Sequence, residues 1–359
     1  MTVSLDAEWA PQSGVMLAWP HPHSDWNNNL AAVERVYCDL CRHITRFEKL
    51  LIIYRDQQHR DHIHNLLSQQ QLGQEQLHWA RAPSNDSWAR DFGPITITIN
   101  KQPTLLNFIF NGWGNKYPAG LDNQVTRQLH SHGYFASTPL KDLDFVLEGG
   151  SIDCDGNGTL LTTRRCLLAP TRNPHINQAG IETLLKETLG IERILWLQHG
   201  GLIGDDTDSH IDMLARFCSR NTIAFTSCDD PDDEHFQALQ AMQQELIQFK
   251  RCDGLPYKLV PLPLPKACFK NDGQRLPASY ANFLIINDAV LLPVYNDPAD
   301  AIARQRLQDC FPEREIITID CLPLIQQYGS LHCVTMQFPE GVLTEGILPK
   351  NISPEDDHQ

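Results

Sequence analysis

The sequence predicts an α/β fold built from similar ββαβ units that close into a ring, an α/β propeller. Two short apolar strands around a polar turn, followed by an amphipathic helix and another strand, recur along the chain. Successive turns lie about sixty residues apart, which is consistent with a radial array of repeats. One strand near each end of the chain lacks a partner, and pairing the two removes open sheet edges. An ordinary open α/β sheet is the alternative.

Four units can be placed directly. Each has two apolar strands around a turn that carries Asn, Asp, Gly or Ser, and then a helix with apolar residues on one face. In chain order, the two strands and the helix are expected at Pro94–Ile99, Thr104–Phe110 and Asp122–His132; at Leu147–Cys154, Thr159–Thr163 and Ile176–Leu189, with a further strand at Arg193–Leu197; at Ile211–Cys218, Thr222–Thr226 and Asp233–Phe249; and at Ala281–Ile286, Val290–Val294 and Ala299–Cys310.

A fifth unit can be assembled from the two ends of the chain. The strand Val15–Trp19, the helix Asn29–Phe47 and the strand Leu50–Tyr54 lack a first strand, and Cys333–Phe338 lacks a partner. Joining these segments completes the fifth unit and closes the ring.

Composition and charge limit the class of protein. The chain has 359 residues, of which 42% are hydrophobic and 20% charged, as in globular enzymes. Because repeat-built folds of this length form one unit, we expect a single catalytic domain over residues 1–345 and a polar tail over 346–359. The net charge of −15 and the pI near 5.4 argue against nucleic acid and anionic membranes as partners, and favour a small cationic substrate.

The N-terminus has no basic-then-apolar leader, and no run of about eighteen apolar residues occurs, so we expect a cytoplasmic protein. The 11 cysteines are an odd number scattered along the chain, which does not resemble a disulfide framework. Cys38 and Cys41 form a CxxC on an apolar helix face without a second pair, and we interpret them as core residues. We expect neither a metal nor a cofactor.

Residues that can carry chemistry occur at corresponding places in the units. Asp91 stands three residues before its hairpin, and the others stand where a first strand is expected to begin. These others are Glu148, His210 with Asp212, Asn282 and Cys333. Because equivalent strand ends converge in a radial array, we expect all of them at one central site.

This set of residues suits a planar, delocalised cation. A guanidinium presents forked N–H donors, so Asp91 and Asp212 can each take a bidentate pair. Its resonance-stabilised carbon resists attack by water, which favours a covalent route through a thiolate at Cys333. His210 would protonate the departing ammonia and then activate water, with Glu148 orienting the imidazole. The sequence leaves open whether the thiolate exists before the substrate binds.

Several motifs also carry a family resemblance. They are Glu8-Trp9-Ala10-Pro11 with Trp19-Pro20, the stretches 85–94, 110–114, 147–151 and 205–212, and Gly329-Ser330-Leu331-His332-Cys333. Together they resemble the agmatine deiminase family, which is related to the bacterial-type peptidylarginine deiminases within the guanidine-modifying, or pentein, superfamily.

The resemblance covers nearly the whole chain. It implies a five-bladed α/β propeller with a central site, and hydrolysis of agmatine to N-carbamoylputrescine and ammonia without a cofactor, in putrescine formation. It places the nucleophile on Cys333, the acid/base on His210, the guanidinium carboxylates on Asp91 and Asp212, and the active-site glutamate on Glu148.

Substrate choice depends on the far end of the pocket. The second ammonium of agmatine calls for acceptors or aromatic faces, whereas the carboxylate of free or C-terminal arginine calls for a cation. Arg90 and Lys116 are the nearby cations, and the sequence does not fix their direction. We therefore expect agmatine, with peptidyl arginine as the alternative, and leave homo-oligomer formation open. The substrate-binding candidates besides Asp91 and Asp212 are Trp88, Trp113, Asp205, Asp206 and Asn282.

Two further interpretations belong to other classes. A Cys-His-Asp acyl-transfer hydrolase, such as a thiol peptidase, needs an oxyanion hole, and two acids aimed at the pocket would repel the oxyanion. A non-catalytic binder of arginine-like cations would make Cys333 incidental. Measuring ammonia during titration with agmatine separates the three.

Overall fold

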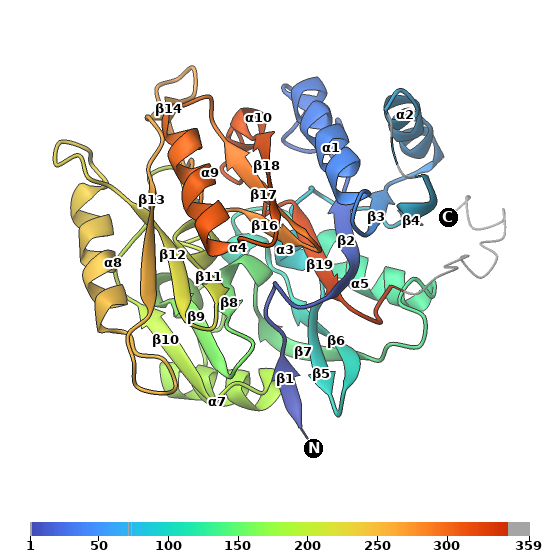
Figure 1. Cartoon of the computed structure of the whole chain (residues 1–359). Coiled ribbons are helices and arrows are strands. Elements are labelled where there is room, and N and C mark those ends of the chain that lie inside the picture. The colour runs from blue at the N-terminus through green and yellow to red at the C-terminus, as the bar shows by residue number, and fades with distance from the viewer. Residues whose placement is uncertain (1, 71, 73, 344–359) are drawn as a thin grey trace.

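The computed structural model describes residues 2–70, 72 and 74–343. Five sheets share one topology, in which an antiparallel pair of strands is followed by a helix and by a strand parallel to the second of the pair (Figure 1). The units are β2 (Gln12–Ala18), α1 (Leu30–Ile44) and β3 (Lys49–Tyr54); β5 (Ile95–Ile99), β6 (Gln102–Ile109), α5 (Asp122–Ser131) and β7 (Leu140–Val146); β8 (Ile152–Cys154), β9 (Thr159–Thr163), α7 (Gln178–Leu189) and β10 (Arg193–Leu197); β11 (Ala215–Ser219), β12 (Thr222–Ser227), α8 (Phe236–Gln248) and β13 (Lys258–Pro263); and β16 (Leu284–Ile286), β17 (Ala289–Val294), α9 (Ala299–Cys310) and β18 (Glu315–Asp320).

The two ends of the chain meet in one sheet, which confirms the predicted pairing. β19 (Thr335–Pro339) runs antiparallel to β2, with Met336 opposite Met16. The late strand therefore supplies the first strand that the N-terminal unit lacks. The polar tail predicted at 346–359 lies outside the described residues.

Several elements extend the repeated units beyond the predicted pattern. β4 (Leu77–Arg81) follows α2 (Gln57–Ser68) and pairs in parallel with β3, and β1 (Val3–Leu5) adds an antiparallel strand to β5. Shorter elements are α3 (Ala89–Phe92), α4 (Gly112–Asn115), α6 (Arg164–Leu167), α10 (Leu322–Ile325), β14 (Cys268–Phe269), β15 (Arg275–Leu276) and 3₁₀ turns at Gln74–Gln76, Gly149–Ser151 and Ile211–Met213.

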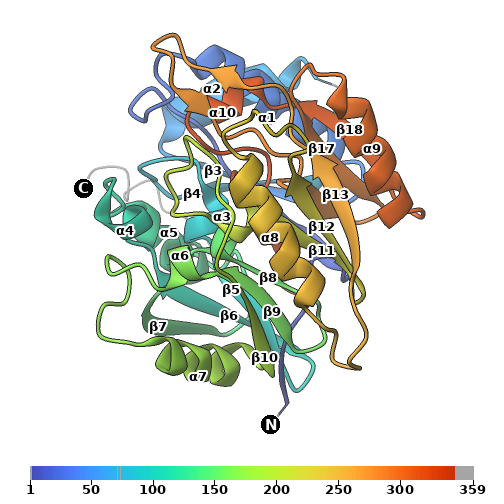
Figure 2. The same cartoon turned by 90° about the vertical axis from the view of Figure 1, so that its left-hand side faces the viewer.

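The longer helices lie toward the outside of the molecule and join neighbouring sheets (Figures 1 and 2). α1 contacts β3 of its own sheet and β18 of another, and α9 contacts β18 of its own sheet and β13 of another. Apolar residues at helical spacing explain this packing, because α1 buries Val33, Tyr37, Leu40 and Ile44 on one face. Among the described helices, none combines the length and the apolar character that crossing a membrane requires.

The first strands of the units begin later than their apolar runs suggest. The run from Leu147 forms a strand only from Ile152, the run from Ile211 only from Ala215, and Cys333 lies two residues before β19. Turns at 149–151 and 211–213 occupy the intervening positions. A strand sends alternate side chains to opposite faces, whereas a turn lets successive side chains and backbone N–H groups approach one point. The residues of the expected site therefore precede the strands.

Candidate active site

One pocket contains several of the expected residues. Its acidic lining side chains are Asp25, Asp86, Asp91 and Asp206, and its thiol is Cys333. Asp91 and Cys333 are 4% and 6% exposed, whereas Asp25 lies at the surface, so the pocket runs from a buried end to an open mouth. Among the lining residues that the structure describes, none is a lysine or an arginine.

Cys333 lies at the buried end beside an amide and a carboxylate. Its Sγ is 3.3 Å from Nδ2 of Asn282 and 3.7 Å from Oδ2 of Asp212. Oδ1 of Asn282 accepts the backbone N–H of His332 at 2.9 Å, which fixes the amide. Burial, and then the negative charges of Asp212 and Asp91, raise the pKa of the Cys333 thiol well above its usual value. These neighbours favour a thiol until a cation binds.

The carboxylates of Asp91 and Asp212 differ in their surroundings. Asp91 accepts the N–H of Gly150 at one oxygen and Nε1 of Trp113 at the other, both at 2.9 Å. Burial, followed by the charges of Asp212 and Glu148, raises the pKa of Asp91 well above its usual range. Asp212 accepts a bond from Nδ1 of His332 at 2.9 Å. Burial acts to raise the pKa of Asp212, but this bond and the charges of nearby cationic groups together lower it.

His210 lies next to these carboxylates. Its Nδ1 is 3.6 Å from Oδ1 of Asp91, and neither ring nitrogen has a hydrogen-bond partner among the described residues. Burial, only partly opposed by Asp212, lowers the pKa of His210 to about 3, so the imidazole is neutral at neutral pH. A Cβ on Gly150 would lie 2.7 Å from Nδ1 of His210 and within 3.0 Å of both carboxylates, so glycine alone keeps this space open.

Glu148 makes a pair that the sequence pattern does not predict. Nε of Arg172 lies 2.9 and 3.0 Å from its two carboxylate oxygens, and both side chains are fully buried. Burial nevertheless leaves the pKa of Glu148 raised, with Arg172 acting in the opposite direction. Among the described contacts Glu148 has no hydrogen bond to His210, although ligand atoms of Glu148, Cys166 and His210 lie within 4.8 Å of one another. The orienting role of Glu148 therefore stays a prediction. The Arg172 charge at this carboxylate disfavours a metal ion there.

The outer part of the pocket is acidic and aromatic. Tyr117 Oη donates to Oδ2 of Asp206 at 2.8 Å. Burial raises the pKa of Asp206 to about 6 and the pKa of Asp86 to about 7. A cation at this end would favour ionisation of both carboxylates.

Asp205 does not line the pocket, unlike its neighbour. Its carboxylate accepts Oγ1 of Thr207 at 2.5 Å and the N–H of Ser209 at 2.6 Å, so it holds the loop that precedes His210. A short acidic side chain often bonds nearby backbone N–H groups in this way. Of the two predicted acids, the structure brings Asp206 to the pocket and Asp205 to the loop.

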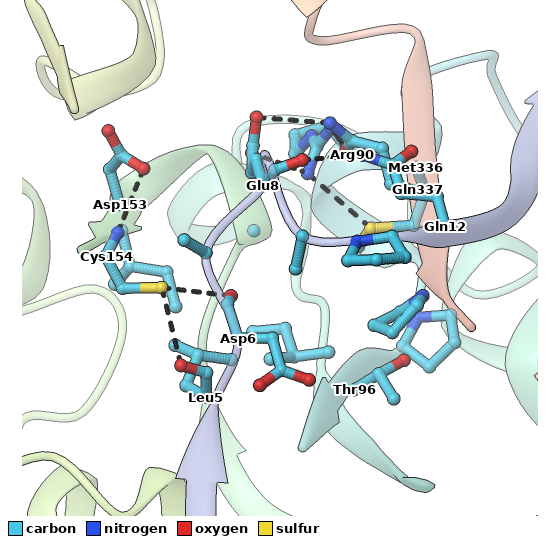
Figure 3. Close-up of a pocket in the computed structure, with 18 residues that line it drawn as sticks. Leu5, Asp6, Glu8, Gln12, Arg90, Thr96, Asp153, Cys154, Met336 and Gln337 are labelled. Carbon is cyan, nitrogen blue, oxygen red and sulfur yellow. Dashed lines mark hydrogen bonds and ion pairs between the residues drawn. The ribbon is translucent and has the colours of Figure 1, made fainter. Parts of the chain in front are cut away.

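The two nearby cations face elsewhere. Lys116 Nζ lies 2.9 Å from Oδ2 of Asp208 and donates to the carbonyl of Asp206. Arg90 contacts Glu8 and Gln337, and all three side chains line a second cavity, which Figure 3 shows. Neither lines the pocket of Cys333.

Aromatic packing and backbone strain shape the pocket. Trp88 packs on Trp26 with ring centroids 5.4 Å apart. Gly329 lies against Trp88 so closely that a Cβ there would be 2.1 Å from the indole ring. The backbone is left-handed at Trp113, Ser209 and Tyr328, with φ of 56°, 67° and 69°, in segments around this site. Such strain persists where surrounding structure enforces it, often at functional sites.

Three residues of the site escape sequence reasoning. Arg172 pairs with Glu148, and His332 links Asp212 to Glu8. Glu8 and His332 stand inside recognisable motifs, which was an available signal, whereas Arg172 lies in a loop without one.

Known proteins resemble the chain over nearly its whole length. The family model of Porphyromonas-type peptidyl-arginine deiminases matches residues 4–339. An agmatine deiminase of Pseudomonas syringae pv. tomato is 32% identical, over 93% of this chain and 95% of that protein. Among solved structures, an agmatine deiminase of C. jejuni with substrate bound is 39% identical, with a TM-score of 0.88 over 95% of this chain and 97% of that one. A solved structure from Porphyromonas gingivalis, of a protein named as an arginine deiminase by inference, is 48% identical. Its TM-score is 0.90 over 95% of this chain and all of that one.

The match of the family model spans the five sheets, and it includes the buried carboxylates, the imidazole and the thiol. The chain therefore belongs to the Porphyromonas-type peptidyl-arginine deiminase family.

Proposed function

We propose that this protein is an agmatine deiminase, which hydrolyses agmatine to N-carbamoylputrescine and ammonia. The observation that carries the proposal is the polarity of the pocket. Its buried end has Cys333 and Asp91, with Oδ2 of Asp212 3.7 Å from the sulfur. Its outer end has Asp25, Asp86 and Asp206, and no lysine or arginine is among the described lining residues. Agmatine is a cation at both ends, so it matches this pocket along its length. Relatives named agmatine deiminases support the same assignment.

The guanidinium binds between Asp91 and Asp212 at the buried end. Asp212 offers Oδ1, which has no hydrogen-bond partner among the described residues. Asp91 is fixed by Gly150 and Trp113 and adds the second counter-charge. A bound cation lowers the pKa of both Asp91 and Cys333, so the substrate itself promotes formation of the thiolate.

The first half of the reaction makes a covalent adduct. Sγ of Cys333 bonds to the guanidinium carbon, and the thiol proton is lost as that bond forms. His210 delivers a proton to the departing nitrogen, the C–N bond breaks, and ammonia leaves a thiouronium on Cys333. His210 is neutral beforehand, so it must first gain a proton. The thiol of Cys333 loses one proton and can supply it.

The second half restores the enzyme. His210, neutral again, accepts a proton from water, whose oxygen bonds to the thiouronium carbon. The C–S bond then breaks as His210 returns that proton to the sulfur, and the remaining hydroxyl proton passes to solvent, where it protonates the released ammonia. This step releases N-carbamoylputrescine and restores the Cys333 thiol. The distal ammonium lies at Asp206 and the aromatic rings of Trp88 and Tyr117, whereas an arginine carboxylate in that place would meet acids.

Peptidylarginine deimination is the second candidate, because the family model carries that name. The outer pocket is open to solvent, so a peptide could enter it. Its described lining residues, however, include no cation that could pair with the carboxylate of a C-terminal arginine. We rank it below agmatine for this reason.

We also propose how the five sheets are arranged and where the protein acts. The five sheets form a five-bladed α/β propeller about the site, which is supported by their common topology and by the helices that contact two sheets each. A single domain over residues 1–345, a cytoplasmic location and a part in putrescine formation remain predictions, as does homo-oligomer formation.

The test is the stoichiometry of the reaction with agmatine. Purified protein should release ammonia and N-carbamoylputrescine in equal amounts, and intact-mass analysis after rapid acid quench should detect an adduct on Cys333. If agmatine binds but neither product appears, the protein is a binder and the proposed function is wrong.

A further inference from the structure

His332 is buried between two carboxylates. Its Nδ1 lies 2.9 Å from Oδ2 of Asp212, and its Nε2 lies 2.8 Å from Oε1 of Glu8. The imidazole side chain is 1% exposed. A neutral imidazole has one donor nitrogen and one acceptor nitrogen, and its acceptor cannot bond to an ionised carboxylate. Two hydrogen bonds to ionised carboxylates therefore need a proton on both nitrogens.

Both carboxylates have further partners that keep them ionised. Glu8 contacts the guanidinium groups of Arg216 and Arg90 and the amide of Gln337. Against the effect of burial, Arg216 and His332 hold the pKa of Glu8 well below its usual range. Against the effect of burial, the pKa of Asp212 is also lowered, by its bond to His332 and by the charges of His332, His210 and Arg216.

The position of Glu8 explains how a segment outside the pocket reaches this site. Glu8 lies between β1 and β2, in the segment that crosses the second cavity, where Figure 3 shows it facing Arg90 and Gln337. Its side chain is 19% exposed. His332 directly precedes Cys333, and its backbone N–H is bonded to Asn282. Neither Glu8 nor His332 lines the pocket of Cys333, and the pair reaches the thiol through Asp212, whose Oδ2 lies 3.7 Å from the sulfur.

We propose that Glu8 and His332 form a positioning pair for Asp212, the carboxylate that binds the guanidinium of the substrate. His332 is an imidazolium that Glu8 anchors, and it occupies Oδ2 of Asp212 while Oδ1 stays available for the guanidinium. The proposal rests on the proposed function for the identity of that cation. His332 is a positioning residue and not a catalytic one, because it acts on the substrate only through Asp212.

The charges around the pair set the conditions under which it exists. His332 faces Glu8 and Asp212, which favour its protonated form, and Arg216 and Arg90, which disfavour it. Burial, Arg216 and Arg90 lower the pKa of His332, and Glu8 and Asp212 oppose this shift without reversing it. The assignment of an imidazolium therefore rests on the geometry of its two short hydrogen bonds to ionised carboxylates. Asp212 in turn faces Asp91, His210, Arg216 and Cys333 besides His332. Removing the charge of Glu8 should therefore convert His332 to a neutral ring.

The protonation state can be measured without turnover. Protein with ¹⁵N-labelled histidine, free of substrate at neutral pH, should show one imidazole with both nitrogens protonated, assigned to His332 by its loss in His332→Gln. In Glu8→Gln the same resonance should move to that of a neutral tautomer. A neutral His332 in the parent protein would overturn the proposal, whatever the enzyme does with agmatine.

Kinetics test the effect on Asp212. In His332→Gln, kcat/KM for agmatine should fall on the order of a hundredfold, mainly through KM, as expected when one partner of a buried charge pair is removed. The acid limb of the pH profile of kcat/KM should move to higher pH, because Asp212 loses the neighbour that keeps it ionised. Glu8→Gln should give a smaller change in the same direction.

His235→Gln is the matched control, because His235 is a buried imidazole bonded to Asp233, which does not line the pocket. It should leave the pH profile unchanged. An unchanged KM and acid limb in folded His332→Gln would contradict the proposal, and if that variant does not fold, Glu8→Gln and the parent NMR spectrum decide. A parent protein without any deiminase activity would refute the proposed function but leave the NMR result valid.

Discussion

The sulfur of Cys333 lies 3.7 Å from Oδ2 of Asp212, the oxygen that also accepts the hydrogen bond from His332. A nucleophile placed beside a buried carboxylate is held as a thiol, because a thiolate there would be repelled. In the proposed function, the same carboxylate attracts the guanidinium. This relationship would then couple substrate binding to activation of the nucleophile.

Replacing the nucleophile should separate binding from turnover. We expect Cys333→Ala to reduce the rate of ammonia release below about a thousandth of the parent rate, because the covalent step has no other thiol at the pocket. Agmatine affinity measured by calorimetry and the thermal unfolding midpoint should stay close to those of the parent. Ammonia release within tenfold of the parent rate would exclude the thiol mechanism.

The two carboxylates should dominate capture of the guanidinium. On the Cys333→Ala background, Asp91→Asn and Asp212→Asn should each weaken agmatine binding by at least about thirtyfold, since a buried cation would keep one counter-charge. Calorimetry measures this directly. Wild-type-like affinity in both variants would show that the guanidinium binds elsewhere.

Agmatine binding should release a proton from Asp91. Its pKa is raised in the free protein by burial, Asp212 and Glu148, and a bound guanidinium lowers it again. The bound state therefore holds fewer protons, so affinity should rise with pH up to the pKa that Asp91 has in the free protein. Calorimetry of Cys333→Ala in buffers of different ionisation enthalpy counts the protons.

The control is the double variant Cys333→Ala/Asp91→Asn. It should lose the proton release that Asp91 contributes, and its agmatine affinity should vary less with pH. The same proton count with and without Asp91 would assign the release to another group and refute the prediction.

Selectivity should depend on Asp206 and not on Asp205. Asp206→Asn should lower kcat/KM for agmatine about tenfold and narrow its preference over arginine, because the distal ammonium loses a counter-charge in a part-buried site. Asp205→Asn is the neighbouring control. It loosens the loop bonded to Ser209, so both substrates should suffer alike. A preference unchanged by Asp206→Asn would remove this residue from the distal pocket.

Local pattern predicted much of the fold. The strand Thr159–Thr163 and the helix Ala299–Cys310 occur at the predicted bounds, because apolar periodicity and turn residues are local signals. The pairing of β19 with β2 followed from the need to remove open edges. β4 and β1 were not predictable in this way, since they extend sheets that are complete without them.

The site divides along the same line. Asp91, Asp212 and Cys333 were predictable because corresponding places in repeated units must converge. The pairing of Arg172 with Glu148 depends on a loop without periodicity, and the contact of Glu8 with His332 joins segments 324 positions apart. Arg172 leaves no local trace in a single sequence, and the motifs that contain Glu8 and His332 do not show that these two residues meet.

The most direct test of the account is a side-by-side measurement of kcat/KM for agmatine, free arginine and a peptidyl arginine. The acidic outer pocket predicts that agmatine exceeds both alternatives by about a hundredfold or more, with all activity lost in Cys333→Ala. Equal or higher kcat/KM for peptidyl arginine would contradict the account, because the outer acids would then have no part in choosing the substrate.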